Sequence, residues 1–135
     1  DFPEGTYGFV YKITHTPSGK SYLGKKVLIH NKKTKLTKKD LLMYEGVQGR
    51  KPTYKIVQKD SSWKSYYGSN KALMELVQTE SLENFKREIL ILCTTKKLLT
   101  YYETQALFTY RVLEKDDIWF NDNILGKFFR KDFDI

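Results

Sequence analysis

The chain has 135 residues, the size of one compact domain. Hydrophobic residues make up 40% of it, and no stretch approaches the roughly 18 to 20 uninterrupted apolar residues of a membrane helix. A transmembrane protein is therefore excluded, and the formal net charge of +8 makes nucleic acid the leading partner, because so basic a surface attracts polyanions.

Three further features of the sequence indicate a folded protein of a reducing compartment. Aromatic residues reach 15%, which argues against a disordered basic tail. The first residues, DFPEGTYGF, lack a basic segment followed by an apolar run, so no secretory signal is expected. Cys93 lies in the apolar run EILILC and is predicted to be a buried thiol rather than half of a disulfide. We expect a cytoplasmic protein.

The first third of the chain predicts a hairpin followed by a basic segment. Residues 8–13 (GFVYKI) and 20–24 (KSYLG) are rich in β-formers and flank the turn sequence TPSG, which is typical of a β-hairpin. Five lysines then fall within residues 32–39 with almost no apolar residue between them. This pattern indicates a solvated, mobile stretch that is either plain surface or a phosphate-contacting loop. Residues 41–62 contain several turn formers, and we assign no element to them.

The second half predicts two helices and a strand. Ser69 or Asn70 can cap a helix whose apolar residues follow helical spacing: Leu73, Leu76 and Val77. Phe85–Leu92 ends in a continuous apolar run, as expected of a central strand covered on both faces. Thr94 or Thr95 can cap a long helix reaching about Glu114. Its predicted apolar face consists of Leu98, Leu99, Tyr102, Ala106, Tyr110 and Leu113.

This order of elements predicts the fold class. We expect a single α+β domain over residues 1–135, with a small three-stranded mixed sheet flanked by helices and a basic insertion around residues 27–62. The tail from Asp116 alternates aromatic and polar residues, and we expect it to fold back over the sheet.

Four sequence blocks, in order, resemble the GIY-YIG nuclease superfamily. The segment YGFVYKITHTPSGKSYLGKK resembles its opening, with Val10 and Tyr11 of FVY as the first signature tripeptide and Tyr22-Leu23-Gly24 as the second. Phe9 stands where the family usually has glycine. The blocks WKSYYGSNKAL, NFKREILILC and LLTYYETQALF resemble a phage-associated branch of putative homing-type endonucleases, and together they cover most of the chain.

The resemblance implies a metal-dependent DNA endonuclease that uses Mg²⁺ or Mn²⁺ and leaves 5′-phosphate and 3′-hydroxyl ends. Glu103 matches the helix glutamate that holds the metal; the alternative is an ordinary solvated glutamate. The neighbouring aromatic side chains would make an inward-facing carboxylate costly unless it were paired or metal-bound. For a phage protein the implied location is the cytoplasm of a bacterial host.

The same resemblance implies roles for the tyrosines and for one lysine. Tyr11 matches the general base or water-positioning residue, and Tyr22 would hydrogen-bond a phosphate oxygen or the attacking water. A free phenol has a pKa of about 10, so its deprotonation near neutral pH needs a nearby positive charge. Lys25 would supply that charge, with Lys26 as the alternative, because neighbouring strand residues point to opposite faces.

Other family positions are matched less directly. The family asparagine corresponds to Asn121, or to Asn123 in another register; the alternative for both is a turn residue. The family arginine of the first helix has no counterpart in IHNKKTKL, where Lys32 falls nearest. Lys64 and Arg87 are the other possible stand-ins, and a lysine cannot reproduce the bidentate grip of arginine on a phosphate.

Several residues outside the motifs are candidates for nucleic-acid contacts. The aromatic residues Trp63, Tyr66 and Tyr67 can stack on unpaired bases while Lys64 binds the backbone. The alternative is that these aromatic residues simply fill the core. Five lysines are expected to contribute sequence-independent affinity for duplex DNA: Lys32, Lys33, Lys35, Lys38 and Lys39. The two histidines, His15 and His30, have no partner at metal-site spacing and are expected at the surface.

Three hypotheses follow. The leading one is the endonuclease, with Tyr11 as base and Glu103 as metal ligand. The second is a basic nucleic-acid-binding module of the same fold that has lost turnover together with the helix arginine. The third is a protein-interaction domain that uses its aromatic tail, which absence of DNA binding at low salt would favour.

Overall fold

The structure, a computed structural model, describes residues 2–46, 49, 52 and 54–133. The chain divides into two compact units. Unit 1 comprises residues 1–28 and 62–135, and unit 2 comprises residues 29–61. Unit 2 falls within the segment that the sequence marks as a basic insertion.

Unit 1 is built on a three-stranded antiparallel sheet with the order β2-β1-β5. Strands β1 (Gly8–His15) and β2 (Lys20–Val27) form the predicted hairpin, and β5 (Phe85–Cys93) pairs with the other side of β1. The fold class is confirmed, but every pairing in this sheet is antiparallel rather than mixed.

The expectation that Phe85–Leu92 is the central strand is wrong. The central strand is β1, which has neighbours on both sides, whereas β5 lies at the edge and exposes most of its side chains. Ile89 is 48% exposed and Leu92 is 44% exposed. A continuous apolar run does not by itself reveal which strand other elements cover. Cys93, at the end of β5, is a buried free thiol as predicted.

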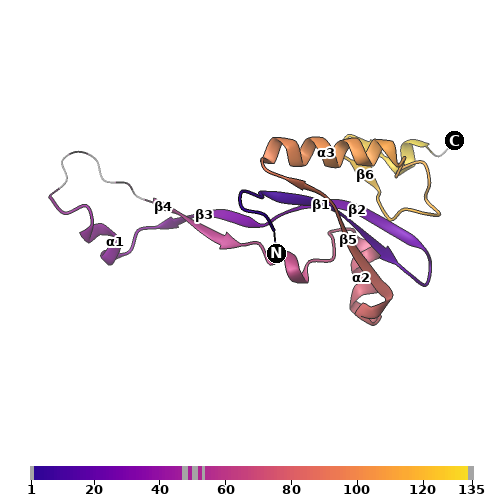
Figure 1. Ribbon diagram of the computed structural model, residues 1–135, viewed down its shortest axis with the longest axis horizontal. Helices are drawn as coiled ribbons and strands as arrows, with labels where there is room; N and C mark the ends of the chain where they lie inside the picture. Colours follow the sequence, from indigo (N-terminus) through magenta and orange to yellow (C-terminus); the bar gives the residue numbers. More distant parts are fainter. Residues whose placement is uncertain (1, 47–48, 50–51, 53, 134–135) are drawn as a thin grey trace. The chain divides into compact units, whose positions relative to one another are not determined.

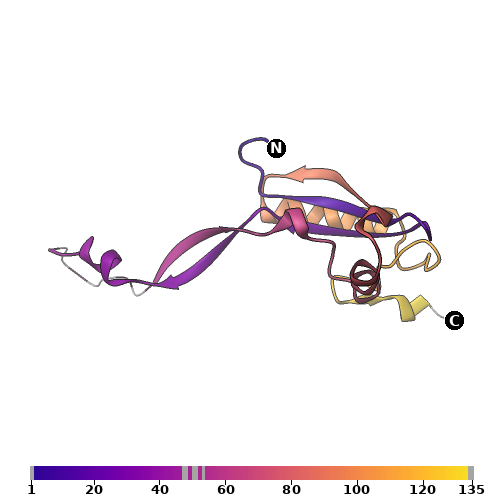
Figure 2. The ribbon, with the colours of Figure 1, turned by 90° about the horizontal axis from the view of Figure 1, so that it is seen from below.

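Helix α3 (Lys96–Thr109) covers one face of the sheet and begins at the predicted cap, where the Thr95 side chain accepts a hydrogen bond from the Leu98 backbone N–H. It runs alongside the strands in both views (Figure 1, Figure 2). Leu99, Ala106 and Leu107 are buried against the core.

The helix is shorter than predicted. It ends at Thr109 because Arg111 adopts a left-handed backbone conformation with φ 54°, which cannot continue an α-helix. Leu98 and Tyr110 of the predicted apolar face are exposed. The contacts of α3 with the core are made by its buried residues Leu99, Ala106 and Leu107.

Helix α2 (Lys71–Thr79) contributes to the core that includes Phe9 and Tyr11. The Asn70 side chain caps it by accepting a hydrogen bond from the Leu73 backbone N–H, as one of the two predicted alternatives has it. Leu73 is fully buried in this core. The other buried members of the core are Phe9, Tyr11, Ile13, Phe85 and Phe120.

The C-terminal tail packs back on the sheet, as expected. The Ser21 backbone N–H donates to the Ile118 carbonyl, and the Phe120 N–H donates to the Ser21 carbonyl. These bonds place Trp119 beside β2. The remaining elements of unit 1 are short: 3₁₀ turns η1 (Trp63–Ser65), η2 (Leu82–Asn84) and η3 (Arg130–Phe133), and strands β6 (Asn123–Ile124) and β7 (Phe128–Phe129).

Unit 2 is a β-ribbon with a short helix. Strands β3 (Ile29–Lys35) and β4 (Tyr54–Asp60) pair antiparallel, and α1 (Lys38–Leu42) follows β3. A reciprocal capping box between Thr37 and Asp40 begins α1, and the Lys55 ammonium binds the Asp40 carboxylate. The lysine-rich segment is thus strand and helix, since the backbone of β3 forms a ladder with β4.

Most of the net positive charge of the chain belongs to unit 2. Residues 29–61 contain nine Lys and Arg against three Asp and Glu, which gives this unit a net charge of +6 out of the chain's +8. Within the described part of the chain, no helix is long and apolar enough to cross a bilayer.

Candidate active site

The two signature tyrosines lie side by side on β1 and β2. Tyr11 pairs with Gly24 across the strands, and Tyr22 is two residues from Gly24, on the same face of the strand. The ring centroids of Tyr11 and Tyr22 are 6.3 Å apart. A Cβ atom at Gly24 would lie 2.7 Å from the Tyr11 hydroxyl oxygen and 3.0 Å from Tyr22 Cε2. Gly24 therefore leaves the space that both phenols occupy.

Glu103 projects from the middle of α3 and is half-buried. Burial is the main cause that raises the pKa of Tyr11 and of Tyr22, and the negative charge of Glu103 is a smaller contribution to each rise. Burial also raises the pKa of Glu103 itself, and the Lys25 ammonium partly opposes that rise. Of the predicted site residues, the structure thus places Tyr11 beside Tyr22 and brings Lys25 to α3, the helix that carries Glu103.

Lys25 and Lys26 serve opposite faces of β2, as strand geometry requires. The Lys25 ammonium donates a hydrogen bond to the Thr100 hydroxyl of α3 at 2.9 Å. The Lys26 ammonium lies 4.1 Å from the centroid of the Tyr66 ring, a close cation–π contact. Of the two lysines, Lys25 is the one whose charge acts on Glu103, and Lys26 contacts the Tyr66 ring.

Tyr66 belongs to the site and was not predicted there. Its ring meets the Tyr11 ring edge-on, with centroids 6.0 Å apart. Arg87 of β5 fixes the turn that carries Tyr66, because its Nη1 donates to the carbonyls of Trp63 (3.1 Å) and Tyr66 (2.9 Å). The WKSYYGS block was the available signal, but its aromatic residues fit a core as well as a site.

The Tyr11 phenol is neutral around physiological pH. Burial raises its pKa far above the ordinary value, and the neighbouring Tyr22, Tyr66 and Glu103 groups raise it further. Burial likewise raises the pKa of Tyr22, although a hydrogen bond with the Ser69 hydroxyl opposes part of the effect. The two hydroxyls are therefore hydrogen-bonding groups in the free protein.

The asparagines serve the backbone. The Asn121 side chain is buried; it accepts a hydrogen bond from the Leu23 N–H at 3.0 Å and donates one to the Leu23 carbonyl at 2.8 Å. It thereby fixes β2 at the residue between Tyr22 and Gly24. Asn123 accepts a hydrogen bond from the Gly126 N–H, which is a turn contact.

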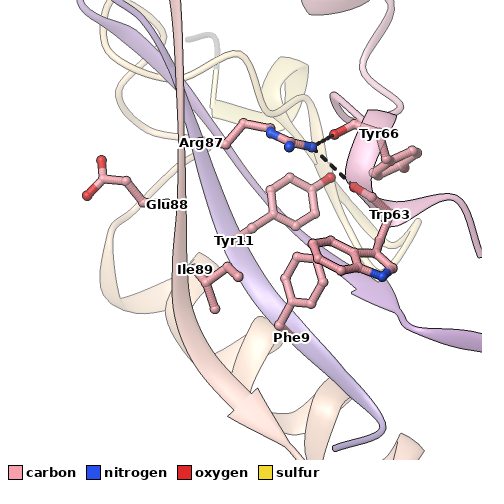
Figure 3. Close-up of a pocket in the computed structure, with 7 residues that line it drawn as sticks. All are labelled: Phe9, Tyr11, Trp63, Tyr66, Arg87, Glu88 and Ile89. Atoms are coloured by element: carbon pink, nitrogen blue, oxygen red, sulfur yellow. Dashed lines mark hydrogen bonds between the residues drawn. The ribbon is translucent and has the colours of Figure 1, made fainter. Parts of the chain in front are cut away.

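The possible stand-ins for the missing arginine lie in different places. Lys32 is part of β3 in unit 2, and its side chain, like those of Lys33 and His30, lies outside the described residues. The Lys64 ammonium lies 5.7 Å from the Trp63 ring centroid. Arg87 shares a cavity with Tyr11 (Figure 3). The structure thus brings one of the three next to a signature tyrosine.

A divalent cation is compatible with this site. No group of three His, Cys, Asp or Glu side chains suited to a metal occurs among the described residues. Mg²⁺ does not need such a group, because it keeps several waters and binds one or two carboxylates together with substrate phosphates. A partly buried carboxylate with a raised pKa, as in Glu103, also gains from a neighbouring cation.

The expectation that His15 lies at the surface is wrong. His15 is 6% exposed, and its ring nitrogens contact the Ser18 hydroxyl at 2.7 Å and the Glu80 carboxylate at 2.9 Å. Because Ser18 belongs to the hairpin turn and Glu80 directly follows α2, these contacts hold the turn to the end of that helix.

A small antiparallel sheet presents two tyrosines on adjacent strands, and the helix that covers one face of this sheet carries Glu103, which is the arrangement expected of a GIY-YIG-type nuclease domain. Residues 1–124 match the family model described as "Putative endonuclease segE, GIY-YIG domain". The chain therefore belongs to this GIY-YIG family. Neither the curated proteins nor the solved structures contain a match to the chain.

Proposed function

We propose that the protein is a DNA endonuclease that hydrolyses backbone phosphodiester bonds with the help of Mg²⁺ or Mn²⁺. The observation that carries the proposal is the pair of signature tyrosines on adjacent strands, with ring centroids 6.3 Å apart, in a sheet that packs against the helix carrying Glu103. Membership of an endonuclease family supports it.

Tyr11 positions the attacking water in this mechanism. A neutral phenol oxygen accepts a hydrogen bond from water, and burial keeps the phenol neutral. The water oxygen then forms a bond to phosphorus and releases a proton to solvent, the bond from phosphorus to the 3′ oxygen breaks, and the leaving oxygen takes up a proton from solvent. The Tyr22 hydroxyl is available to bind a non-bridging phosphate oxygen. The base role expected from the resemblance would require a phenolate, which this environment disfavours.

Several positively charged groups would act on the negatively charged phosphate. A divalent cation held by Glu103, when bound, would neutralise phosphate charge and favour deprotonation of nearby hydroxyls. Lys25, which binds Thr100, keeps an ammonium beside Glu103. Arg87 is the proposed substitute for the helix arginine, because its Nη2 and Nε have no hydrogen-bond partner among the described residues.

Affinity for the duplex would come from unit 2. Its net charge of +6 and the exposed side chains of Lys35, Lys38 and Lys39 suit sequence-independent contacts to phosphates.

The test compares Glu103→Gln with the wild type on supercoiled plasmid in Mg²⁺. We expect at least about a hundredfold slower nicking, since the cation loses its carboxylate, while DNA affinity in EDTA stays the same. Glu75→Gln, which changes an exposed carboxylate on α2, is the matched control and should cleave normally. Equal cleavage by the Glu103 variant would refute this mechanism.

A second candidate function is a nucleic-acid-binding module without turnover. One observation favours it: α2, the helix of unit 1 that precedes β5, carries no arginine. Salt-dependent DNA binding without nicking, in Mg²⁺ and in Mn²⁺ and on several sequences, would establish this function and refute the endonuclease.

A further inference from the structure

A cavity of about 150 Å³ lies next to Tyr11. The residues that line it are Phe9, Tyr11, Trp63, Tyr66, Arg87, Glu88 and Ile89, all of them in unit 1 (Figure 3). Four of these side chains are aromatic. The Glu88 carboxylate points away from the others, so the cavity contains no acidic group among them.

The rings are arranged as walls and do not stack on one another. Trp63 meets Phe9 edge-on at 6.0 Å and 81°, and Phe9 meets Tyr11 at 6.0 Å and 65°. Phe2 supports Trp63 from another side, with centroids 4.8 Å apart. Neither of these pairs of lining rings is a parallel stack, and Trp63 is only partly buried.

The size of the cavity suits one six-membered aromatic ring. In a different protein, an engineered apolar cavity of about 150 Å³ binds benzene. A pyrimidine base has one ring of this kind, whereas a purine has two fused rings.

Arg87 supplies the polar recognition. Its Nη1 is engaged by the carbonyls of Trp63 and Tyr66, and its guanidinium lies 4.6 Å from the Tyr67 ring centroid. These contacts fix the guanidinium while leaving Nη2 and Nε without a partner among the described residues. Free donors at the edge of an aromatic cavity suit the carbonyl oxygens of a pyrimidine.

The geometry points to a pocket for an unpaired pyrimidine base of the DNA strand, stacked on Trp63 and hydrogen-bonded by Arg87. This inference rests on the proposed function only for its biological role: Tyr11 lines both this pocket and the candidate active site, so a base seated here would hold the adjoining phosphate near the tyrosine hydroxyls. Extruding a base is easiest from single-stranded or mismatched DNA.

Binding of fluorescently labelled octanucleotides, measured by anisotropy in EDTA, tests the pocket without any cleavage. The probes are single-stranded dT8, dA8 and an abasic octamer of equal charge. We expect dT8 to bind at least about tenfold more tightly than the abasic octamer, because stacking on an aromatic side chain strengthens the binding of each base. We also expect dT8 to bind more tightly than dA8, because the cavity suits one ring and a purine has two. Equal affinities for dT8 and the abasic octamer, or a preference for dA8, would overturn the inference.

Two variants locate the binding. Trp63→Leu removes the stacking surface, and Ile89→Trp fills the cavity from a position that is 48% exposed, so it leaves the core intact. Both should abolish the difference between dT8 and the abasic octamer. Lys64→Gln, in the same 3₁₀ turn as Trp63, is the matched control and should weaken both probes alike. Persistence of the difference in Ile89→Trp, with an unchanged thermal unfolding midpoint, would overturn the pocket.

The outcome is separate from that of the plasmid assay. Selective dT8 binding by a protein that never nicks plasmid would support the pocket and refute the endonuclease. Plasmid nicking without selective dT8 binding would do the opposite.

Discussion

The two units differ in how they use their polar residues. Unit 1 keeps the signature tyrosine and the helix glutamate away from bulk water: Tyr11 is 4% exposed, and Glu103 is half-buried. Unit 2 exposes the side chains of Lys35, Lys38 and Lys39, and it holds +6 of the net charge in residues 29–61. Phosphate attraction needs only accessible cations, whereas hydrolysis needs groups held in place away from bulk water. The comparison separates an element for affinity from an element for chemistry, and four changes test that separation.

The largest effect is expected from Tyr11→Phe. Removing the hydroxyl should slow single-turnover cleavage by at least about a hundredfold, because the attacking water loses its partner. DNA affinity and its salt dependence should not change. Tyr101→Phe, at a 59% exposed position on α3, is the control. A loss of affinity as large as the loss of rate would contradict the separation of the two units.

The reciprocal change is the triple variant Lys35→Gln, Lys38→Gln and Lys39→Gln in unit 2. Each lysine that binds a phosphate should contribute about 0.9 to the slope of log K against log salt, so its removal should reduce the slope by that amount. The duplex affinity of the triple variant at low salt should fall more than about tenfold. The cleavage rate at saturating protein should stay the same. The control removes three exposed lysines of unit 1, namely Lys86, Lys115 and Lys127. If the control weakens binding as much, unit 2 has no special role in affinity.

A smaller effect tests how the site is packed. Gly24→Ala places a methyl group 2.7 Å from the Tyr11 hydroxyl oxygen, which should destabilise the protein by about 1–3 kcal/mol and slow cleavage. In a Tyr11→Phe background that closest atom is absent, so the cost should shrink. Denaturant unfolding of the four proteins of this double-mutant cycle measures the coupling. Identical costs in both backgrounds would mean that Gly24 does not make room for the phenol.

The smallest effect concerns acid stability, because among the described residues each unit has one carboxylate with a lowered pKa. In unit 1 the hydrogen bond from His15, then that from Asn84, lowers the pKa of Glu80 below 4.5. In unit 2 Lys55 and Thr37 lower the pKa of Asp40 from 3.8 to about 2. A lowered pKa stabilises the folded state above the unfolded-state value, and this contribution disappears as pH falls through the folded-state value.

We therefore expect thermal stability to decline below about pH 4.5 with a component that Glu80→Gln removes. NMR signals of α1 and β4 should keep their native shifts until the pH approaches the pKa of Asp40, and Asp40→Asn should remove this dependence. An acid transition of unit 2 that Asp40→Asn leaves unchanged would exclude the Lys55 contact as its cause.

Local signals predicted local structure well. The hairpin follows from β-formers around TPSG, and the helix starts follow from Asn70 and Thr95, whose capping bonds reach only three residues along the chain. The signature tyrosines and Glu103 were found through a family resemblance, and the structure places the two tyrosines side by side. The end of α3 was misjudged because the apolar spacing continues beyond Arg111, where the backbone turns left-handed.

Contacts between distant residues account for what the sequence did not reveal. Whether β5 is central or at the edge depends on which strands pair with β1. The role of Tyr66 depends on its meeting Tyr11, which is far away along the chain, and on the bonds from Arg87. Aromatic residues look alike in sequence whether they fill a core or line a cavity.

The sequence by itself determined the net charge and its concentration in one segment, the starts of α2 and α3, the hairpin and the family. Only the tertiary structure decided that β1 is central, that Tyr11 is buried and neutral, and that Arg87 lies beside it. The physical reason is range. Capping and turn formation depend on hydrogen bonds between near neighbours, whereas burial and electrostatic fields sum over residues that only the folded chain brings together.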